Sequence, residues 1–513
     1  MKEMRFSVAI GSSEKQIVRV DDFRIPQNRI TFLLGESGIG KSLVSKAIYG
    51  LLDPQELGIT INRRPYQAYL DLNWSKSVRT NSFFVFQEPS SHLNPLRKIQ
   101  TQLREGSLRE AANENEILEK LYRMPAEHTA RRILEVYPKP YRPSGGEKQR
   151  VLLAMAFKKI STLANGVGLD EPTMFVFDEP TGSLDDNYRN LFLQMLFEQY
   201  RKRPFTILLI THDYSIISEV YRGHRDLLEE VRFRELVREK AEHVSLRDFS
   251  PDRYLNWLRN TAPAPARVDN EKTVLQVNRA FKVFGRKMGV FRDVEHSHPT
   301  NLVIRQGEMA YLKAPSGIGK TTLAKIVMGL LQPDSIEMEL SGIPLTADTP
   351  TSLWRSKIWG RKAGMVFQHA DESLNLQASI KETFTGLRHL RRLTTEDITK
   401  LLGRLFDIEI NSDFLKRPVA RLSGGQKQRL NLLRTLALET DLVILDEPLN
   451  GLDFDSVTKV LGMLDEKREQ GVALLMISHN EEIFDHIVPR QSVFHLHALE
   501  DDHRTDSSIR RRA

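Results

Sequence analysis

The sequence contains no cysteine, and it contains no apolar run long enough to cross a bilayer. The lack of cysteine excludes disulfide bonds and thiolate metal sites, and it is compatible with a reducing compartment. A membrane-spanning helix needs about 20 apolar residues. The opening segment from Met1 to Ser7 also lacks the apolar core of a secretion signal. If the protein works at a membrane, we expect other chains to do the spanning.

The numbers of basic and acidic residues are nearly equal, so the charge excludes few classes of function. The 513 residues include 74 Lys and Arg against 67 Asp and Glu, which gives a net charge of +7. This mild excess would suit an anionic ligand, nucleic acid or an anionic membrane surface, and it selects none of them. The hydrophobic content of 40% is ordinary for a soluble globular protein. The length exceeds what one core supports, so several domains are expected.

One ordered set of motifs occurs twice. In the first half it consists of residues 35–42, Gln87, residues 144–147, Asp178 with Glu179, and His212. In the second half it consists of residues 314–322, Gln368, residues 423–426, Asp446 with Glu447, and His479. One glycine-rich loop could arise by chance, but five elements recurring in the same order could not. The chain is therefore two copies of one module.

One interval within the repeat differs between the two halves. It measures 34 positions from Ser144 to Asp178 but 23 from Ser423 to Asp446. The excess falls in the turn-rich stretch 160–172, which predicts a surface insertion in the first half.

Short apolar runs predict the strands of the two modules. They cover residues 30–34, 83–86, 174–177 and 206–210 in the first half and 309–312, 365–367, 442–445 and 472–477 in the second. Such runs are typical of buried parallel strands. Each is followed by a candidate functional residue, and open α/β sheets build their sites at the carboxyl ends of strands. Helices are expected over 42–49 and 321–330, so the fold class is α/β.

The first glycine-rich loop has the pattern of a phosphate-binding loop. Its residues are Gly35, Glu36, Ser37, Gly38, Ile39, Gly40, Lys41 and Ser42. Small residues let backbone N–H groups wrap phosphates at a helix N-terminus, where the partial positive charge favours anions. We expect Lys41 to neutralise the β- and γ-phosphates and the Ser42 hydroxyl to coordinate Mg²⁺.

The second loop departs from this pattern at its first position. Its residues are Ala314, Pro315, Ser316, Gly317, Ile318, Gly319, Lys320, Thr321 and Thr322. Alanine tolerates most backbone geometry except a positive φ. We therefore expect this loop to bind phosphates too, with Thr321 in the role of Ser42.

Two consecutive carboxylates end a buried strand in each half. Burying such a pair is costly unless a cation or a water network accompanies it. We assign Asp178 and Asp446 to a Mg²⁺ shell, and Glu179 and Glu447 to activating the attacking water. The alternative is an acidic pair that caps a turn before proline, and its occurrence in both halves argues against that. His212 and His479 follow strands in the same register, and a contact with the γ-phosphate is the favoured interpretation over a structural histidine.

Two Ser-Gly-Gly segments precede apolar helices and form the last repeated element. They consist of Ser144, Gly145, Gly146 and Glu147 in the first half and Ser423, Gly424, Gly425 and Gln426 in the second. Each offers a helix N-terminus with bare backbone donors, which would suit a γ-phosphate presented across an interface.

The residues between the two modules are rich in charges of both signs. Phe233, Leu236, Val237, Ala241 and Val244 recur at helical spacing and predict an amphipathic helix whose charges form a solvated face rather than a nucleic-acid arm. We expect a first domain over 1–230, a charged helical connector with an Ala/Pro linker over 231–272, a second domain over 273–500 and a basic, disordered tail over 501–513. No closing strands are evident after His212.

Together these motifs resemble those of ABC-type ATPases, here with two nucleotide-binding domains in tandem. The most specific element is the signature Leu422-Ser-Gly-Gly-Gln426, with Pro143-Ser-Gly-Gly-Glu147 as its first-half equivalent. The resemblance implies, for each domain, a RecA-like parallel-sheet core, an antiparallel β subdomain and a helical subdomain. It also implies two ATP and Mg²⁺ sites, each shared between one domain's phosphate loop and the other domain's signature, with both sites active.

The resemblance adds roles for further residues. Gln87 and Gln368 would complete the Mg²⁺ shell and assist catalysis. Phe284, in Lys282-Val-Phe-Gly285, resembles the aromatic residue on which adenine stacks, and its first-half counterpart is not evident.

The segment that begins at Gln87 points to a subfamily. It resembles the glutamine loop of the oligopeptide, dipeptide and nickel importer ATPases, and the second half keeps Ser373-Leu-Asn375 but loses both prolines. This predicts ATP-driven import of peptides or a related solute through separate permease subunits, with an extracytoplasmic binding protein, no nucleic-acid partner, and a cytoplasmic location on the inner face of the membrane. The alternative is a soluble tandem ATPase that acts on ribosomes, nucleic acid or an enzyme complex.

Overall fold

The structure, a computed structural model, describes residues 2–12, 15–105, 108, 114–123, 139–141, 143–164, 171–182, 186–239, 242–263, 272–292, 295, 298–315, 317–385, 387 and 393–499. Ser316, residues 165–170 of the predicted insertion and the predicted basic tail lie outside the described residues. The chain divides into two compact units, the first Met1–Trp257 with Gly451–Phe454 and the second Leu258–Asn450 with Asp455–Ala513.

The first unit contains an antiparallel sheet and a mainly parallel one. The antiparallel sheet has the order β2-β1-β4-β5 and the other the order β10-β9-β3-β8-β7-β6. The strands are β1 (Glu3–Gly11), β2 (Gln16–Pro26), β3 (Ile30–Gly35), β4 (Gly58–Ile61), β5 (Arg64–Pro65), β6 (Phe84–Val85), β7 (Phe175–Asp178), β8 (Ile207–Ile210), β9 (Val231–Arg238) and β10 (Val244–Asp248).

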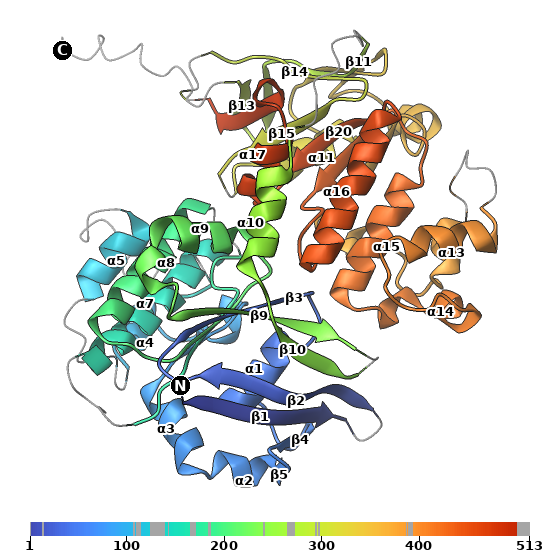
Figure 1. Cartoon of the computed structure of the whole chain (residues 1–513). Coiled ribbons are helices and arrows are strands. Elements are labelled where there is room, and N and C mark those ends of the chain that lie inside the picture. The colour runs from blue at the N-terminus through green and yellow to red at the C-terminus, as the bar shows by residue number, and fades with distance from the viewer. Residues whose placement is uncertain are drawn as a thin grey trace, which may run out of the picture. The chain divides into compact units, whose positions relative to one another are not determined.

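Helices cover these sheets and form a separate helical region. They are α1 (Lys41–Tyr49), α2 (Tyr66–Leu70), α3 (Asn73–Asn81), α4 (Ile99–Leu103), α5 (Glu114–Tyr122), α7 (Gly145–Ala164), α8 (Asp186–Lys202) and α9 (Ser215–Gly223), followed by α10 (Pro251–Asn260). Helix α1 shares one apolar core with strands of both sheets (Figure 1), through Val44, Ala47 and Ile48. Helix α7 packs on α4, α5 and α8.

The second unit repeats this plan. Its sheets have the orders β14-β11-β16-β17 and β12-β13-β21-β15-β20-β19-β18. The strands are β11 (Thr273–Val277), β12 (Ala280–Val283), β13 (Arg286–Phe291), β14 (Leu302–Arg305), β15 (Met309–Lys313), β16 (Glu337–Leu340), β17 (Ile343–Thr346), β18 (Ala363–Val366), β19 (Leu442–Asp446), β20 (Ala473–Ile477) and β21 (Val493–Ala498). The helices are α11 (Lys320–Val327), α12 (Thr351–Leu353), α13 (Thr395–Gly403), α14 (Ser412–Lys416), α15 (Gly424–Leu436), α16 (Phe454–Glu469) and α17 (Glu481–Ile487).

Neighbouring strands in the orders β3-β8-β7-β6 and β15-β20-β19-β18 pair in parallel, as the apolar runs predict. The α/β fold class is confirmed. Each predicted strand run overlaps an observed strand, and the two predicted helices correspond to α1 and α11. Among the described residues, no helix is long and apolar enough to span a membrane.

The predicted amphipathic helix between the modules is wrong. Residues Val231–Arg238 form β9, which pairs in parallel with β3, and Val244–Asp248 form the antiparallel edge strand β10. The spacing misleads because β9 is an inner strand whose two faces are both covered. Buried residues therefore occur at odd and at even positions along it: Phe233, Arg234 and Leu236. The ring of Phe233 stacks on Phe32 of β3 with centroids 5.0 Å apart. These are the closing strands that were not evident after His212.

Candidate nucleotide site

The first phosphate loop joins β3 to α1. Gly35, Gly38 and Gly40 have φ angles of 132°, 77° and 112°, which residues with a side chain rarely adopt. A Cβ atom at Gly35 would lie 2.7 Å from the carbonyl oxygen of Leu236 in β9. The loop therefore needs glycine here, because the backbone of β9 lies directly against it.

Lys41 and Ser42 begin α1 and set the chemistry of this loop. Lys41 is buried, and its Nζ donates to the carbonyl oxygens of Gly35 at 2.6 Å and Glu36 at 3.0 Å. Burial lowers the pKa of this ammonium group. Oγ of Ser42 donates to Oδ1 of Asp178 at 2.8 Å. A cation and a hydroxyl thus stand at a helix N-terminus, where anions are favoured.

Asp178 ends β7 and is only 1% exposed. Its Oδ2 has no hydrogen-bond partner among the described residues. Burial raises the pKa of its carboxyl to about 6. A buried carboxylate oxygen without a partner is costly, and a carboxylate beside a hydroxyl provides the oxygen ligands that Mg²⁺ prefers.

Glu179 connects three of the predicted site residues. Its carboxylate accepts from Nε2 of Gln87 at 2.9 Å, and it lies 2.9 Å from Nδ1 of His212. Burial raises the pKa of Glu179, but the charge and hydrogen bond of His212 outweigh it, and the net pKa lies below the usual value. Burial likewise opposes the charge on His212, and Glu179 reverses this and raises its pKa. The first site therefore pairs a carboxylate with an imidazole, and each group favours the charged form of the other.

The second loop accommodates alanine without strain. Gly317 and Gly319 take φ angles of 81° and 121°, as their first-half counterparts do, whereas Ala314 is not among the residues with positive φ. Lys320 is buried, and its Nζ donates to the carbonyl oxygen of Ala314 at 2.5 Å. The methyl group of Ala314 is thus compatible with a loop that holds its lysine in the same way.

The second carboxylate pair has different partners. Within the described part of the chain, neither side-chain oxygen of Asp446 makes a well-formed hydrogen bond; burial raises its pKa, and the nearby Thr321 side chain opposes that rise. Glu447 accepts from Oγ of Ser478 at 3.0 Å, and its Oε1 lies 3.7 Å from Nε2 of His479. Burial raises the pKa of Glu447 to about 7. No hydrogen bond joins it to Gln368 in the described structure. The two sites therefore share residue types but differ in how the glutamate is held.

Both signature segments begin helices, as predicted. Ser144 precedes α7, and its backbone N–H and hydroxyl donate to Oε2 of Glu147 at 2.9 and 3.0 Å. Ser423 precedes α15 and forms a capping box with Gln426. These caps fix the first turns. A Cβ atom at Gly145 would meet nothing within 4 Å, so the first turn of α7 opens onto free space.

The predicted adenine platform lies in a turn between β12 and β13. Phe284 is 73% exposed and has a φ of 50°. In the first unit, sequence reasoning missed Val18 of β2, whose Cγ2 would lie 3.0 Å from a Cβ atom at Gly40. A hairpin side chain thus packs on the phosphate loop there, and no sequence motif marks it.

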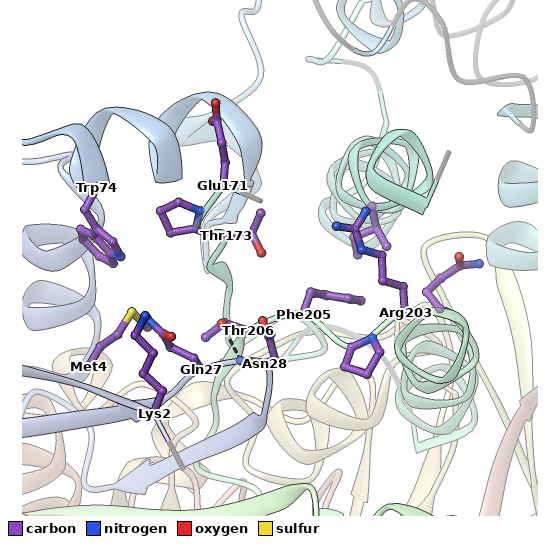
Figure 2. Close-up of a pocket in the computed structure, with 14 residues that line it drawn as sticks. Lys2, Met4, Gln27, Asn28, Trp74, Glu171, Thr173, Arg203, Phe205 and Thr206 are labelled. Carbon is purple, nitrogen blue, oxygen red and sulfur yellow. Dashed lines mark hydrogen bonds between the residues drawn. The ribbon is translucent and has the colours of Figure 1, made fainter. Parts of the chain in front are cut away.

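A separate cavity of about 480 Å³ lies at the end of the first unit's sheet where the parallel strands begin. Figure 2 shows Lys2, Trp74, Arg203 and Phe205 around it. Thr173 and Thr206 line it just before β7 and β8 begin, whereas Asp178 is the last residue of β7 and His212 follows the end of β8. It is therefore not part of the nucleotide site.

Comparison with known proteins gives the family. The family model described as ABC transporter matches residues 18–182 and 297–450, one match in each half. The chain belongs to the ABC transporter family. ABC transporter ATP-binding subunits hydrolyse ATP, so this chain is a tandem ABC ATPase.

Relatives of this ABC ATPase match nearly its whole length. An uncharacterized ABC transporter ATP-binding protein, YejF of Escherichia coli K12, is 29% identical and covers 92% of this chain and 90% of its own. The glutathione import ATP-binding protein GsiA of Pectobacterium atrosepticum is 27% identical, with coverages of 93% and 82%. The peptidoglycan transport ATP-binding protein YejF of Agrobacterium fabrum is 28% identical, with coverages of 92% and 87%.

Solved structures show the fold of this ABC ATPase. The RNase-L inhibitor matches with a TM-score of 0.60 at 16% identity, over 95% of this chain and 89% of that chain. An archaeal ribosome recycling factor, aABCE1, matches with a TM-score of 0.59 at 17% identity, over 93% and 87%. At such identities the likeness is one of fold alone.

Proposed function

We propose that this ATPase energises the import of a peptide or a related small solute through separate membrane permease subunits. The relatives are import and transport ATP-binding proteins and match along most of both chains. The permease would place the chain on the inner face of the cell membrane, and an extracytoplasmic binding protein would deliver the solute. The observation that carries the proposal is the glutamine loop of the first unit, which joins Glu179 through Gln87 to the exposed side chain of Leu96.

Each site has a proposed division of labour. Lys41 and Lys320 would bind the β- and γ-phosphates, Glu179 and Glu447 would activate the attacking water, and His212 and His479 would contact the γ-phosphate. Ser42 with Asp178, and Thr321 with Asp446, would hold Mg²⁺, with Gln87 and Gln368 completing the shell. The unpartnered carboxylate oxygens of Asp178 and Asp446 fit this ion. When bound, Mg²⁺ would neutralise charge that develops on the phosphates.

Each ATP would complete its site with the signature of the opposite unit. The open first turn at Gly145 leaves backbone donors accessible to a phosphate. ATP binding would thus close the two units, and hydrolysis would let them part. This gives the permease a cycle of two states.

The glutamine loop links catalysis to a docking surface. Gln87 donates to Glu179, and a few residues later Leu96 is 81% exposed. Oδ1 of Asn94 accepts from the N–H of Leu96 at 2.9 Å, and the side chain of Gln102 bonds the backbone of Asn94 and Arg97. The turn is therefore rigid, so a helix that pressed on Leu96 would act on the segment that carries Gln87.

The second unit has a groove beside its own glutamine loop. A cavity of about 550 Å³ is lined by residues that include Ser373, Asn375, Glu382 and Arg434. Arg434 is held in its wall by a hydrogen bond from Nε to the carbonyl oxygen of Thr383 at 3.0 Å. Its mixed polar lining suits a short helix of a permease subunit, and the counterpart of Leu96 at its rim is Gln377.

The decisive experiment is co-purification of the full chain with candidate permease subunits. Leu96→Gln, which installs the residue found at Gln377, should lower permease binding at least tenfold and leave basal ATP hydrolysis unchanged. Ile408→Gln is the matched control, because Ile408 is another exposed aliphatic residue, 41% exposed, in the other unit. It should leave permease binding intact.

Two outcomes would overturn the transport proposal. One is ATP hydrolysis indifferent to every permease pair that the chain binds. The other is sedimentation with ribosomes, or a tight and salt-sensitive affinity for nucleic acid, without permease binding.

A further inference from the structure

The helix that begins at each signature also contacts the glutamine loop of its own unit. In the first unit, the buried residue Gln149 lies five positions after Ser144. Its Nε2 donates to the carbonyl oxygen of Phe86 at 3.5 Å, and Phe86 directly precedes Gln87. A buried amide without a hydrogen-bond partner is costly, which favours keeping this long bond. The signature helix α7 is thereby fastened to the residue beside Gln87.

The second unit makes the same contact at equivalent positions. Gln428 is buried five positions after Ser423, and its Nε2 donates to the carbonyl oxygen of Phe367 at 3.4 Å. Phe367 directly precedes Gln368. The buried Asn431, three positions further along α15, donates from Nδ2 to the same carbonyl oxygen at 3.4 Å. The contact therefore recurs in both copies of the module.

A lysine adds a second contact in each unit. Nζ of Lys148 donates to Oγ of Ser90 at 3.4 Å, and Nζ of Lys427 donates to Oδ1 of Asp371 at 2.9 Å. Ser90 and Asp371 each lie three positions after the loop glutamine of their own unit. Each signature helix thus holds its glutamine loop on both sides of the glutamine. We term these contacts the loop clamp, formed by Lys148 and Gln149 in the first unit and by Lys427 and Gln428 in the second.

The helix transmits a movement of the clamp to the signature. An α-helix rises 1.5 Å per residue, so the backbone N–H groups of Gly145 and Gly146 lie within about 6 Å of Gln149 along the axis of α7. Caps formed by Ser144 and Ser423 fix the first turns of the two helices. A shift of the glutamine loop that carried the clamp with it would therefore shift the signature too.

Under the proposed function, the clamp lies between groups that serve different ATP sites. Gln87 donates to Glu179 and belongs to the site of the first phosphate loop. The signature of the same unit, residues 144–147, would complete the site of the second phosphate loop. The first clamp therefore connects the state of one site to the geometry of the other. The second clamp makes the reverse connection, because Gln368 and residues 423–426 are divided between the sites in the same way.

We propose that Gln149 and Gln428 are positioning residues through which the nucleotide state of one ATP site sets the signature of the other. The proposal rests on the assignment of the glutamine loops and signatures under the proposed function. Neither glutamine touches a reacting atom, and each acts through the loop and the helix that it joins. Because the sites are coupled in this way, a chain that is blocked at one site stalls at the other.

The test measures whether a block at one site stalls the other. Full-length Glu179→Gln should lose at least about 100-fold in ATP turnover, because the second site waits for the first. Gln149→Met keeps the length of the side chain and removes the donor. When both changes are present, we expect about half of the turnover of Gln149→Met alone, because the uncoupled second site runs by itself.

The repeat supplies a crossed control. Gln149→Met should relieve the stall in Glu179→Gln but not the stall in Glu447→Gln. Gln428→Met should relieve the stall in Glu447→Gln but not the stall in Glu179→Gln. A purely structural glutamine would lower the melting temperature and relieve neither stall, which would overturn the proposal.

Two further variants keep the result interpretable. Gln194→Met is the matched control, because Gln194 of α8 is exposed and donates to Glu198 at 3.0 Å. It should relieve neither stall. If Gln149→Met fails to fold, Lys148→Met breaks the other contact of the same clamp and should raise the turnover of Glu179→Gln at least about fivefold. Unchanged turnover there would refute the proposal.

The outcomes separate this inference from the proposed function. A stall in Glu179→Gln that persists when Gln149→Met is added would refute the coupling alone. Half of the wild-type turnover in Glu179→Gln with both clamps intact would also refute it, because the sites would then run independently. Full turnover in Glu179→Gln plus Glu447→Gln would refute the catalytic assignment itself.

Discussion

Gly35 of the first phosphate loop lies against the backbone of Leu236, and the 2.7 Å that a Cβ atom would leave between them admits no side chain. The contact joins a catalytic loop to β9, a strand that the sequence pattern assigns to a helix. At the equivalent position of the second loop, Ala314 is tolerated because its backbone does not take a positive φ.

Gly35→Ala should therefore destabilise the first unit, whereas Ala314→Gly, the reverse change at the equivalent position of the second loop, should have little effect on stability. We expect it to lower the free energy of unfolding of the first unit by about 1–3 kcal/mol, because it adds a clash to a φ of 132°. Ala314→Gly should change stability by less than about 1 kcal/mol. Urea unfolding of the full-length variants measures both, and equal effects would contradict this account of the loop.

Glu179→Gln should separate ATP binding from turnover. The glutamine cannot accept a proton from water, so turnover should slow by about 10²–10⁴, the usual scale for a positioned acid–base group. Fluorescent ATP titration should give an affinity near that of the wild type. Glu447→Gln should behave likewise, and unimpaired turnover in the double variant would exclude these residues as bases.

Lys41→Ala should weaken nucleotide binding at the first site. The variant loses the cation and leaves the carbonyl oxygens of Gly35 and Glu36 without their donor. We expect affinity there to fall at least tenfold, on the order of 1.4 kcal/mol, measured by calorimetric titration. Lys46→Ala on the same helix is the control, and a comparable loss there would point to damage to α1 rather than to a phosphate contact.

His92 should make the first unit sensitive to mild acid. Burial lowers the pKa of His92 below its usual 6.5, and its ring packs against Phe83 and Phe86 with centroids 5.1 and 5.3 Å away. Because the folded state holds the neutral ring, the unfolded state binds more protons below pH 6.5, and stability falls as the pH drops through that range. When the pH drops from 7.5 to 5.5, the melting temperature of His92→Gln should fall less than that of the wild type. An identical acid response would show that the histidine is not the cause.

Much of the site could be predicted from the sequence because its parts are local. A glycine-rich loop needs only its own residues to take positive φ, and Gly38, Gly40, Gly317 and Gly319 do so. The helices that follow Ser144 and Ser423 begin with caps formed by residues three positions away. The carboxylates lie at strand ends because the apolar runs before them are buried. Because these features depend on residues close together in the chain, the repeat, its family and the residue types at each site could be recognised from the sequence.

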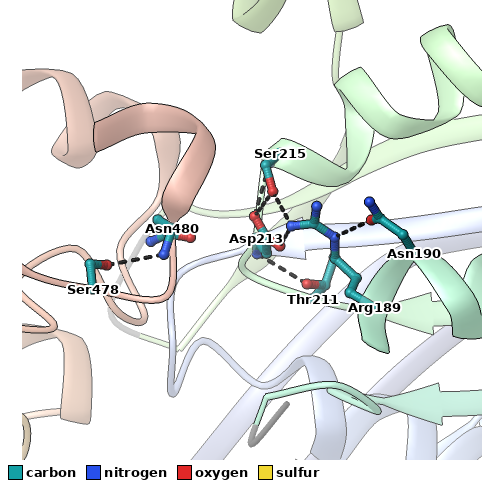
Figure 3. A network of polar contacts seen from close by, with 7 residues as sticks. All are labelled: Arg189, Asn190, Thr211, Asp213, Ser215, Ser478 and Asn480. Atoms are coloured by element: carbon teal, nitrogen blue, oxygen red, sulfur yellow. Dashed lines mark hydrogen bonds and ion pairs between the residues drawn. The ribbon is translucent and has the colours of Figure 1, made fainter. Parts of the chain in front are cut away.

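The tertiary structure decided what depends on distant neighbours. Segment Val231–Arg238 is a strand because β3 and β10 pair with it along both edges, and no local pattern carries that information. Arg189 pairs with Asp213 (Figure 3) only because α8 packs beside the end of β8, and the sequence motifs stop one residue short of that aspartate. The orientation of each histidine likewise follows from contacts made across the fold. The spacing of motifs along the chain identifies the candidate reacting groups, whereas burial and contacts between distant elements determine how each group is held.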